Sequence, residues 1–143
     1  MTKLDQTHLN QVYTLLRASN LMTEDIDLSI HQLFGELQGE NLIAMAALEV
    51  YGTNALLRSV AVDTNHKNAG YGKSMVIDVE ADALQNGISN IYLLTETAGN
   101  FFNKLGYEQI DRSSVPKEIL KTTQFAELCP QSAVCMTKKL NDE

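Results

Sequence analysis

The stretch between Asp63 and Ser74 combines two glycines with two lysines. The apolar run before it predicts a strand, and the residues from Gly72 onward have helical spacing, so the stretch is a strand-to-helix loop. Gly70 and Gly72 allow a ligand to approach the backbone closely. The N–H groups of the first helical turn, together with the positive end of the helix dipole, favour a phosphate or pyrophosphate. The sequence therefore predicts a nucleotide-type phosphate-binding loop.

Glu49 and Arg58 are charged residues inside strand patterns that are otherwise apolar. If Thr53 and Asn54 are the two central turn residues, Glu49 lies directly opposite Arg58 and the two form a cross-strand ion pair. A guanidinium can also hold a carboxylate through two hydrogen bonds, which an amino-acid substrate would offer. The residues alone leave both roles open.

Two common phosphate-binding loops do not fit the glycine spacing. A P-loop needs a glycine at the position of Lys67, and a dinucleotide-binding fingerprint needs one at the position of Met75. The spacing that fits is [Q/R]-x-x-G-x-[G/A], with Lys67 in the first place and Val60-Ala61-Val62 before it. This pattern resembles the acetyl-CoA-binding motif of the GNAT N-acetyltransferases. An ordinary strand–loop–helix junction would carry the same glycines.

Later segments extend the resemblance over about residues 40 to 140. Asn100–Tyr107 is similar to the late helix of the family, whose usual wording is close to F-[FY]-x-x-x-G-[FY]. The tail Phe125–Val134, with Leu57-Arg58-Ser59 and Leu93–Thr97, is similar to one branch of the family. That branch contains arsenic-resistance N-acetyltransferases and enzymes that acetylate the α-amine of amino acids, glutamate synthases included.

The resemblance implies acetyl-CoA as co-substrate and assigns its contacts. The backbone N–H near Val60 would meet the oxyanion of the transition state, and the strand would bind the pantetheine amides. Asn100 and Lys104 would contact CoA, although a solvated helix face explains them equally well. The cofactor-binding residues expected in the strand and loop are Val60, Ala61, Val62, Lys67, Asn68, Ala69, Gly70, Tyr71, Gly72, Lys73 and Ser74.

The resemblance also suggests catalytic and substrate-binding residues. Glu49 occupies a position that often carries a general base, and Arg58, with Ser59, would bind the substrate carboxylate. Thr95 and Glu96 would face the amine pocket, although Glu96 fits an exposed strand end as well. Many relatives protonate the leaving CoA with a tyrosine, but Phe102 stands there. Tyr107 is the alternative donor, or a core residue. A thiol with a pKa of about 8.5 can also leave without an acid.

The elements that must position these residues follow the hydrophobic spacing. They predict an α+β domain of three layers, α/β/α, and the resemblance implies a GNAT-like, mostly antiparallel and splayed central sheet with flanking helices. Helices are expected at 7–19, 72–85 and 99–105, and strands at 31–38, 42–50, 55–63, 91–95, 107–111 and 133–138, with a loop or short helix at 115–128.

Composition limits the class of protein. A chain of 143 residues predicts a single domain, 1–143. The net charge of −7, from 11 basic and 18 acidic residues, argues against nucleic acid as a partner. No run is long enough for a membrane span and no signal-peptide core is seen, which favours a cytoplasmic protein. Cys129 and Cys135 lack metal-site spacing and are expected as buried reduced thiols, with no metal. His31 and His66 receive no role.

The sequence therefore predicts an acetyltransferase for the amine of a small amino acid or amino-acid-like compound, acting by direct attack in a ternary complex. The acidic composition leaves a second option open, acetylation of polyamines or protein lysines. A third is a non-catalytic acyl-CoA sensor, consistent with Phe102 and Lys67. The resemblance also allows a homodimer. From the charge and the lack of a long apolar run, neither nucleic acid nor a membrane is expected as a partner.

Overall fold

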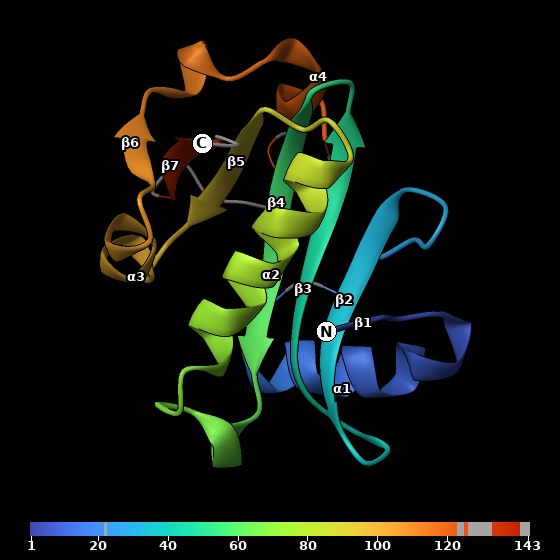
Figure 1. Ribbon diagram of the computed structural model, residues 1–143. Helices are drawn as coiled ribbons and strands as arrows, with labels where there is room; N and C mark the ends of the chain where they lie inside the picture. Colours follow the sequence, from blue (N-terminus) through green and yellow to red (C-terminus); the bar gives the residue numbers. More distant parts are fainter. Residues whose placement is uncertain (22, 123–124, 126–132, 141–143) are drawn as a thin grey trace. The chain divides into compact units, whose positions relative to one another are not determined.

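The computed structural model contains two compact units of chain (Figure 1). It describes residues 1–21, 23–122, 125 and 133–140. The first unit contains Met1–Glu49 and Leu57–Asp82; the second contains Val50–Leu56 and the described residues from Ala83 onward. Three continuous elements run from one unit into the other: β3 (Asn41–Tyr51), β4 (Asn54–Val62) and α2 (Tyr71–Gln85).

The first unit is built on four neighbouring strands in the order β1-β2-β3-β4. The short β1 (Thr2–Lys3), which the sequence did not predict, pairs antiparallel with β2 (His31–Gln38), and β2 pairs antiparallel with β3. The register of β2 and β3 shifts by one residue beside Glu36, so β3 carries an extra residue there. Beyond this bulge, His31 lies directly opposite Glu49.

The turn between β3 and β4 corrects one sequence expectation. β3 ends at Tyr51 and β4 begins at Asn54, so the turn residues are Gly52 and Thr53 rather than Thr53 and Asn54. Gly52 has a φ of +62°, a left-handed conformation that glycine adopts without strain. Counted outward from this turn, Glu49 and Arg58 are diagonal neighbours on one sheet face instead of directly opposed residues.

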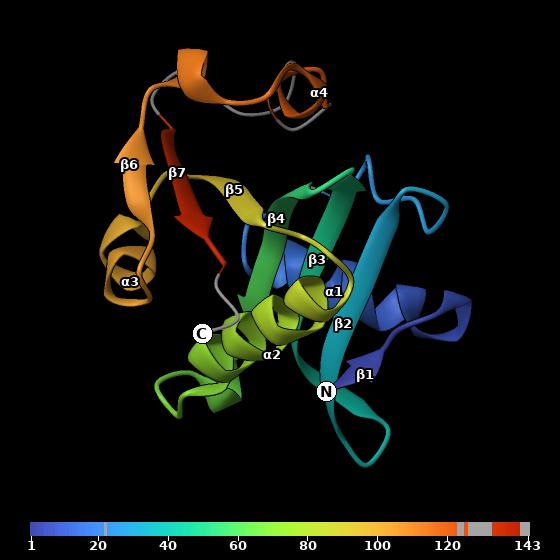
Figure 2. The ribbon, with the colours of Figure 1, turned by 45° about the horizontal axis from the view of Figure 1, so that its top comes forward.

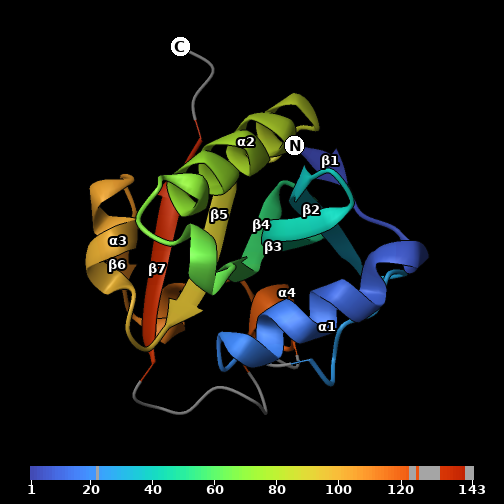
Figure 3. The ribbon, with the colours of Figure 1, turned by 90° about the horizontal axis from the view of Figure 1, so that it is seen from below.

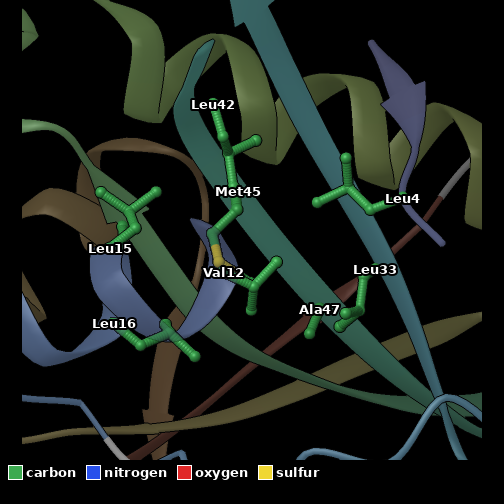
Figure 4. Packing of buried hydrophobic residues seen from close by; sticks show 9 residues of the cluster. Leu4, Val12, Leu15, Leu16, Leu33, Leu42, Met45 and Ala47 are labelled. Atoms are coloured by element: carbon green, nitrogen blue, oxygen red, sulfur yellow. The ribbon is translucent and has the colours of Figure 1, made fainter. Parts of the chain in front are cut away.

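One face of the first unit packs against α1 (Leu9–Ala18). Helical spacing places Val12, Leu15 and Leu16 on the buried side of α1, as the sequence predicts. Figure 4 shows these side chains packed against residues of the strands. The buried members of this cluster are Leu4, Val12, Leu15, Leu16, Leu33, Leu42, Met45, Ala47 and Ala61.

The opposite face of these strands is covered by α2, as Figure 3 shows. Its first-turn residue is Tyr71, one position before the expected start, and it ends at Gln85 as expected. Met75 and Val79 are buried, as the sequence predicts. Gly87, with a φ of +85°, follows the end of the helix in the left-handed conformation typical of that position.

In the second unit, β7 (Val134–Lys139) lies between β5 (Asn90–Thr95) and β6 (Glu108–Ile110) and is antiparallel to both (Figure 2). The first three residues of β4, Asn54–Leu56, pair in parallel with Asn90–Tyr92 of β5. Two short helices, α3 (Gly99–Lys104) and α4 (Lys117–Leu120), complete the unit. Its buried cluster consists of Leu56, Val115, Ile119, Phe125 and Cys135.

The seven strands form one mixed sheet in the order β1-β2-β3-β4-β5-β7-β6, which confirms the α+β class and the mostly antiparallel sheet. Most of the tail 125–134, including Cys129, lies outside the described residues. In the part of the chain that the structure describes, no helix has the length and apolar character needed to cross a bilayer.

Candidate active site

The phosphate-binding loop predicted from the sequence connects β4 to α2 in the first unit. Asn68 and Gly70 have φ values of +65° and +86°, so two of the three residues before α2 are in the left-handed conformation. The first helical hydrogen bond runs from the Ser74 N–H to the Gly70 carbonyl, over 3.0 Å. The N–H groups of Gly72 and Lys73 come before it, in the turn where a helix has no backbone acceptor to offer them. N–H donors in such a position favour the binding of an anion.

Side chains at the start of the loop hold it to the sheet. The Asp63 N–H donates to the Ile43 carbonyl over 2.7 Å. His66 Nδ1 lies 2.9 Å from Asp63 Oδ2, and His66 Nε2 lies 3.2 Å from Gln38 Oε1 on β2. The His66 ring also meets the Tyr71 ring edge to face, with centroids 5.8 Å apart. His66, which received no role from the sequence, therefore fixes the position of the loop.

A second group of polar side chains lies on the sheet face that α1 covers. His31, Glu49 and Arg58 expose 4%, 5% and 3% of their surface. His31 Nε2 is 3.1 Å from Glu49 Oε2, and Arg58 Nη1 is 3.7 Å from the same oxygen. The cross-strand ion pair that the sequence left open is therefore present, and a histidine joins it.

The guanidinium of Arg58 has a closer partner in Asp25, from the segment between α1 and β2. Nη2 donates to Asp25 Oδ1 over 2.7 Å and Nη1 donates to Oδ2, which makes the pair bidentate. Nε of Arg58 donates to Ser59 Oγ over 3.2 Å. Burial by itself raises the pKa of Asp25, but the hydrogen bonds and charge of Arg58 outweigh it and hold that pKa below its ordinary value.

A tight turn presents His31 to this cluster. Asp27 accepts hydrogen bonds from the Ile30 and His31 N–H groups through its carbonyl, and from Ser29 through its carboxylate. The Asp27 N–H donates to His31 Nδ1 over 3.0 Å. The backbone of this turn therefore fixes both the position and the orientation of the imidazole ring.

Ser59 interrupts the regular alternation of β4. Its φ of +60° is left-handed, which is uncommon for a residue with a side chain. Arg58 and Ala61 are three positions apart, yet Arg58 reaches Glu49 and Ala61 packs in the α1 cluster on the same face. An irregular residue between them is what such spacing requires. The next residue is Val60, whose N–H is expected from the resemblance to meet the oxyanion.

The expected site residues divide between the two units. The first unit brings together Glu49, Arg58–Val62 and the loop Lys67–Ser74. The second contains Thr95, Glu96, Asn100, Lys104 and Tyr107. Glu96, Asn100 and Lys104 are exposed, and Thr95 Oγ1 accepts a hydrogen bond from the Ala98 N–H over 2.9 Å.

Tyr107 is 1% exposed and packs edge to face on Phe102, with ring centroids 5.6 Å apart. Lys138 Nζ lies 5.7 Å from the centroid of the Tyr107 ring. The sequence left two roles open for Tyr107, a proton donor or a core residue. This environment supports the role of a core residue. Across the described ranges, no group of three or more His, Cys, Asp or Glu side chains is arranged to hold a metal ion.

Asp25 and His31 belong to the buried cluster around Arg58 although the sequence gives neither of them a role. Asp25 lies in a polar segment that gives no sign of its partner. His31 faces Glu49 only because of the bulge in β3, which moves the register by one residue. Without it, His31 would lie opposite Leu48, whose side chain points to the other face.

The site combines a strand that has a left-handed residue with a glycine loop and a helix N-terminus. Comparison with known proteins shows the family to which this chain belongs. The chain belongs to the acetyltransferase (GNAT) family, whose model matches residues 7–107. It is 30% identical over 95 residues to an uncharacterized N-acetyltransferase of Chlorobaculum tepidum, a match covering 66% of this chain and 59% of the relative.

Two further proteins are similar to the chain. An amino-acid acetyltransferase of Enterobacter sp. is 30% identical over 112 residues, or 76% of this chain and 24% of that protein. The crystal structure of N-acetylglutamate synthase from Neisseria gonorrhoeae, complexed with coenzyme A and L-arginine, has a TM-score of 0.79 and 18% identity. That match covers 98% of this chain and 32% of the other. The chain thus spans 59% and 24% of the two curated relatives.

Proposed function

We propose that the protein is an acetyl-CoA-dependent N-acetyltransferase that acts on the amine of a small amino acid or amino-acid-like compound. The observation that carries the proposal lies within the first unit. A loop that opens onto a helix N-terminus follows a strand that contains a left-handed residue, and a buried carboxylate, Glu49, belongs to the same unit. Family membership gives this arrangement its chemistry.

The loop fits the pyrophosphate of CoA. The N–H groups of the first turn of α2 would bind phosphate oxygens, and the exposed side chains of Lys67 and Lys73 would supply positive charge. An added Cβ at Gly70 meets no protein atom within 4 Å, so the space beside its backbone is open to a ligand. The backbone of Val60–Val62 would bind the pantetheine amides, and Asn100 and Lys104 would add contacts.

Acetyl transfer needs a neutral amine, because an ammonium ion has no lone pair. In the proposed step Glu49, directly or through one water, accepts the amine proton while nitrogen attacks the thioester carbonyl. The N–C bond forms, the Val60 N–H stabilises the oxyanion, and the C–S bond then breaks to release the thiolate. With phenylalanine at position 102 and Tyr107 buried, the thiolate takes its proton from solvent.

An amino acid is supported as the acceptor by the similarity to an amino-acid acetyltransferase and to N-acetylglutamate synthase. Arg58, with Ser59, is the proposed contact for the substrate carboxylate, and Thr95 and Glu96 are proposed as further substrate-binding residues. In the structure the Arg58 guanidinium holds Asp25. A substrate carboxylate would therefore share Arg58 with Asp25 or replace it.

One observation favours a cationic acceptor as the second candidate. The buried cluster sets two carboxylates, Asp25 and Glu49, against one guanidinium, Arg58, so it carries a net charge of −1 while His31 is neutral. A negative cluster attracts a second ammonium group, as in a polyamine or a protein lysine.

The test measures thiol release from acetyl-CoA, with mass spectrometry of the acetylated product. The panel contains amino acids, their carboxamides, the corresponding decarboxylated amines, polyamines and a lysine peptide. We expect amino acids to exceed their carboxamides by at least about 100-fold in kcat/KM, because a site built for a polar group strongly rejects analogues without it.

Two variants test the proposed roles of Glu49 and Arg58. Glu49→Gln keeps the shape of the side chain but removes the base, so turnover should fall about 100-fold or more while CoA still binds. Arg58→Lys keeps the buried charge but loses the bidentate geometry, so discrimination against the carboxamide should weaken. Equal rates on amino acid and carboxamide would favour the cationic acceptor. CoA binding without turnover on any amine would favour the sensor function.

A further inference from the structure

His31 and Glu49 form a directly opposed pair on neighbouring strands. The register of β2 and β3 places them face to face, and His31 Nε2 lies 3.1 Å from Glu49 Oε2. The side chain of His31 is 3% exposed and that of Glu49 is 6% exposed, so water hardly competes for the contact. A buried imidazole therefore stands beside the carboxylate that the proposed mechanism uses as its base.

The protonation state of His31 follows from its other nitrogen. Because Nδ1 accepts a hydrogen bond from the Asp27 N–H, Nδ1 carries no proton, and the neutral ring must carry its proton on Nε2. Among the described residues no acceptor makes a well-angled hydrogen bond to Nε2. Glu49 Oε2, 3.1 Å away, lies within hydrogen-bond distance of Nε2.

We infer that His31 is a positioning residue, which donates its Nε2–H to Glu49 and holds that carboxylate ionised and oriented for proton transfer. This inference rests on the acetyltransferase activity proposed above. His31 touches neither the amine nor acetyl-CoA in this role. The turn from Asp27 to His31 fixes the ring through two hydrogen bonds. The Asp27 N–H donates to Nδ1 and so determines the tautomer, and the Asp27 carbonyl accepts from the His31 N–H and so holds the backbone of His31 in place.

Other charges act on the same carboxylate. Arg58, on β4, favours the ionised form of Glu49 from 3.7 Å, whereas Asp25, from the segment before β2, neutralises part of that guanidinium. His31 adds a donor of its own, with Nε2 3.1 Å from Glu49 Oε2. Removing it should raise the pKa of Glu49 and leave Glu49 protonated over a wider range of pH.

The two ends of the imidazole can be removed separately. In His31→Asn the shorter amide retains an acceptor for the Asp27 N–H but does not reach Glu49. In His31→Gln the longer amide places an N–H near the position of Nε2 and gives up the bond to Asp27. If His31 only stabilises the turn, His31→Asn should preserve the properties of the wild type better than His31→Gln. If His31 positions Glu49, His31→Gln should preserve them better.

The experiment combines a ¹³C NMR titration of the Glu49 carboxyl with kcat/KM against pH for the best amine in the panel. For His31→Asn we expect the pKa of Glu49 and the acid limb of the profile to move up together by about one unit. His31→Gln should move both by less than half as much. A ¹⁵N spectrum of the wild-type ring should show the proton on Nε2. Circular dichroism and the CoA-induced rise in Tm serve as checks that each variant folds.

An unchanged Glu49 pKa in His31→Asn, an equal shift in both variants, or a ring proton on Nδ1 would overturn the inference. Failure of the proposed function looks different. A wild-type protein that acetylates no amine would overturn that function and the role in proton transfer with it. The NMR titration would then still decide whether His31 donates to Glu49.

Discussion

Asp25 is the side chain that keeps Arg58 charged inside the first unit. The side chain of Arg58 is 1% exposed and that of Asp25 is 9% exposed, so neither charge has much contact with solvent. Removal of one partner from such a pair leaves a buried charge without compensation, which costs far more than loss of a surface ion pair. Glu49, at 3.7 Å, supplies only part of that compensation.

We therefore expect Asp25→Asn to lower the free energy of unfolding at pH 7 by about 3 kcal/mol, the lower end for a broken buried pair. The pKa of Asp25 in the folded protein lies below 3.8, the ordinary value for an aspartate, so the unfolded chain takes up the proton first. Its stabilisation is thus complete above that value and is lost as pH falls through the folded pKa. Urea unfolding between pH 7 and pH 2 measures both effects.

Asp27→Asn is the matched control for this prediction, because Asp27 lies two residues along the same segment but is exposed. It should change stability much less than Asp25→Asn. An Asp25→Asn variant whose stability falls with acid as steeply as the wild type would show that Asp25 does not titrate as described.

At the scale of elements, the loop before α2 is both a structural turn and the proposed cofactor site. Gly70 and Gly87 adopt nearly the same left-handed conformation, with φ of +86° and +85°, and neither would bring an added Cβ within 4 Å of another atom. They differ in position, because Gly70 comes before the first turn of α2 and Gly87 follows its end. Because an alanine should be strained to a similar degree at both positions, comparing the two substitutions separates an effect on CoA binding from an effect on stability.

We expect Gly70→Ala and Gly87→Ala each to lower the free energy of unfolding by about 1–2 kcal/mol, since both force a side chain into the left-handed region. Only Gly70→Ala should weaken CoA binding, by roughly tenfold or more, because its methyl group and the altered turn lie where the pyrophosphate would bind. Thermal unfolding and calorimetric titration with CoA measure the two effects. Equal CoA affinities in the two variants would place the pyrophosphate elsewhere.

Several elements could be predicted from the sequence because their signals are local. The alternation of β2 gave its bounds, 31–38, and the helical spacing and glycine of α2 gave its position to within one residue. The contacts between strands were harder to predict from the sequence. One extra residue in β3 turns Glu49 toward His31, and no residue type in β3 indicates that bulge. Likewise, Ser59 takes a left-handed φ at a position where the sequence shows only a serine in an apolar run.

At the scale of the whole molecule, the sequence predicts one domain, and the structure contains two compact units that share three continuous elements. The boundary crosses β3 after Glu49, β4 after Leu56 and α2 after Asp82. Each of these is a continuous strand or helix, so the second unit cannot unfold without breaking hydrogen bonds in elements that belong also to the first. We therefore expect the units to unfold together, as one cooperative transition.

Cys135 offers a probe of the second unit. It is 3% exposed, and its burial raises the pKa of its thiol to about 11, despite the opposing charge of Arg112. At pH 8 only roughly one thiol in a thousand would be ionised, so an aromatic disulfide reagent should react with Cys135 only when the unit opens. A Cys129→Ser variant makes Cys135 the single thiol, and the double Cys129→Ser, Cys135→Ser variant is the blank.

In a urea series we expect the midpoint for Cys135 labelling, with short pulses of reagent, to coincide with the midpoint from far-ultraviolet circular dichroism, which reports the strands and helices of both units. Coincidence of two such probes is the mark of two-state unfolding. Labelling that is complete at a lower urea concentration, while most of the dichroism remains, would show that the second unit opens by itself. In that case α2 and β4 would have to fray at Asp82 and Leu57, and the single-domain prediction would be wrong.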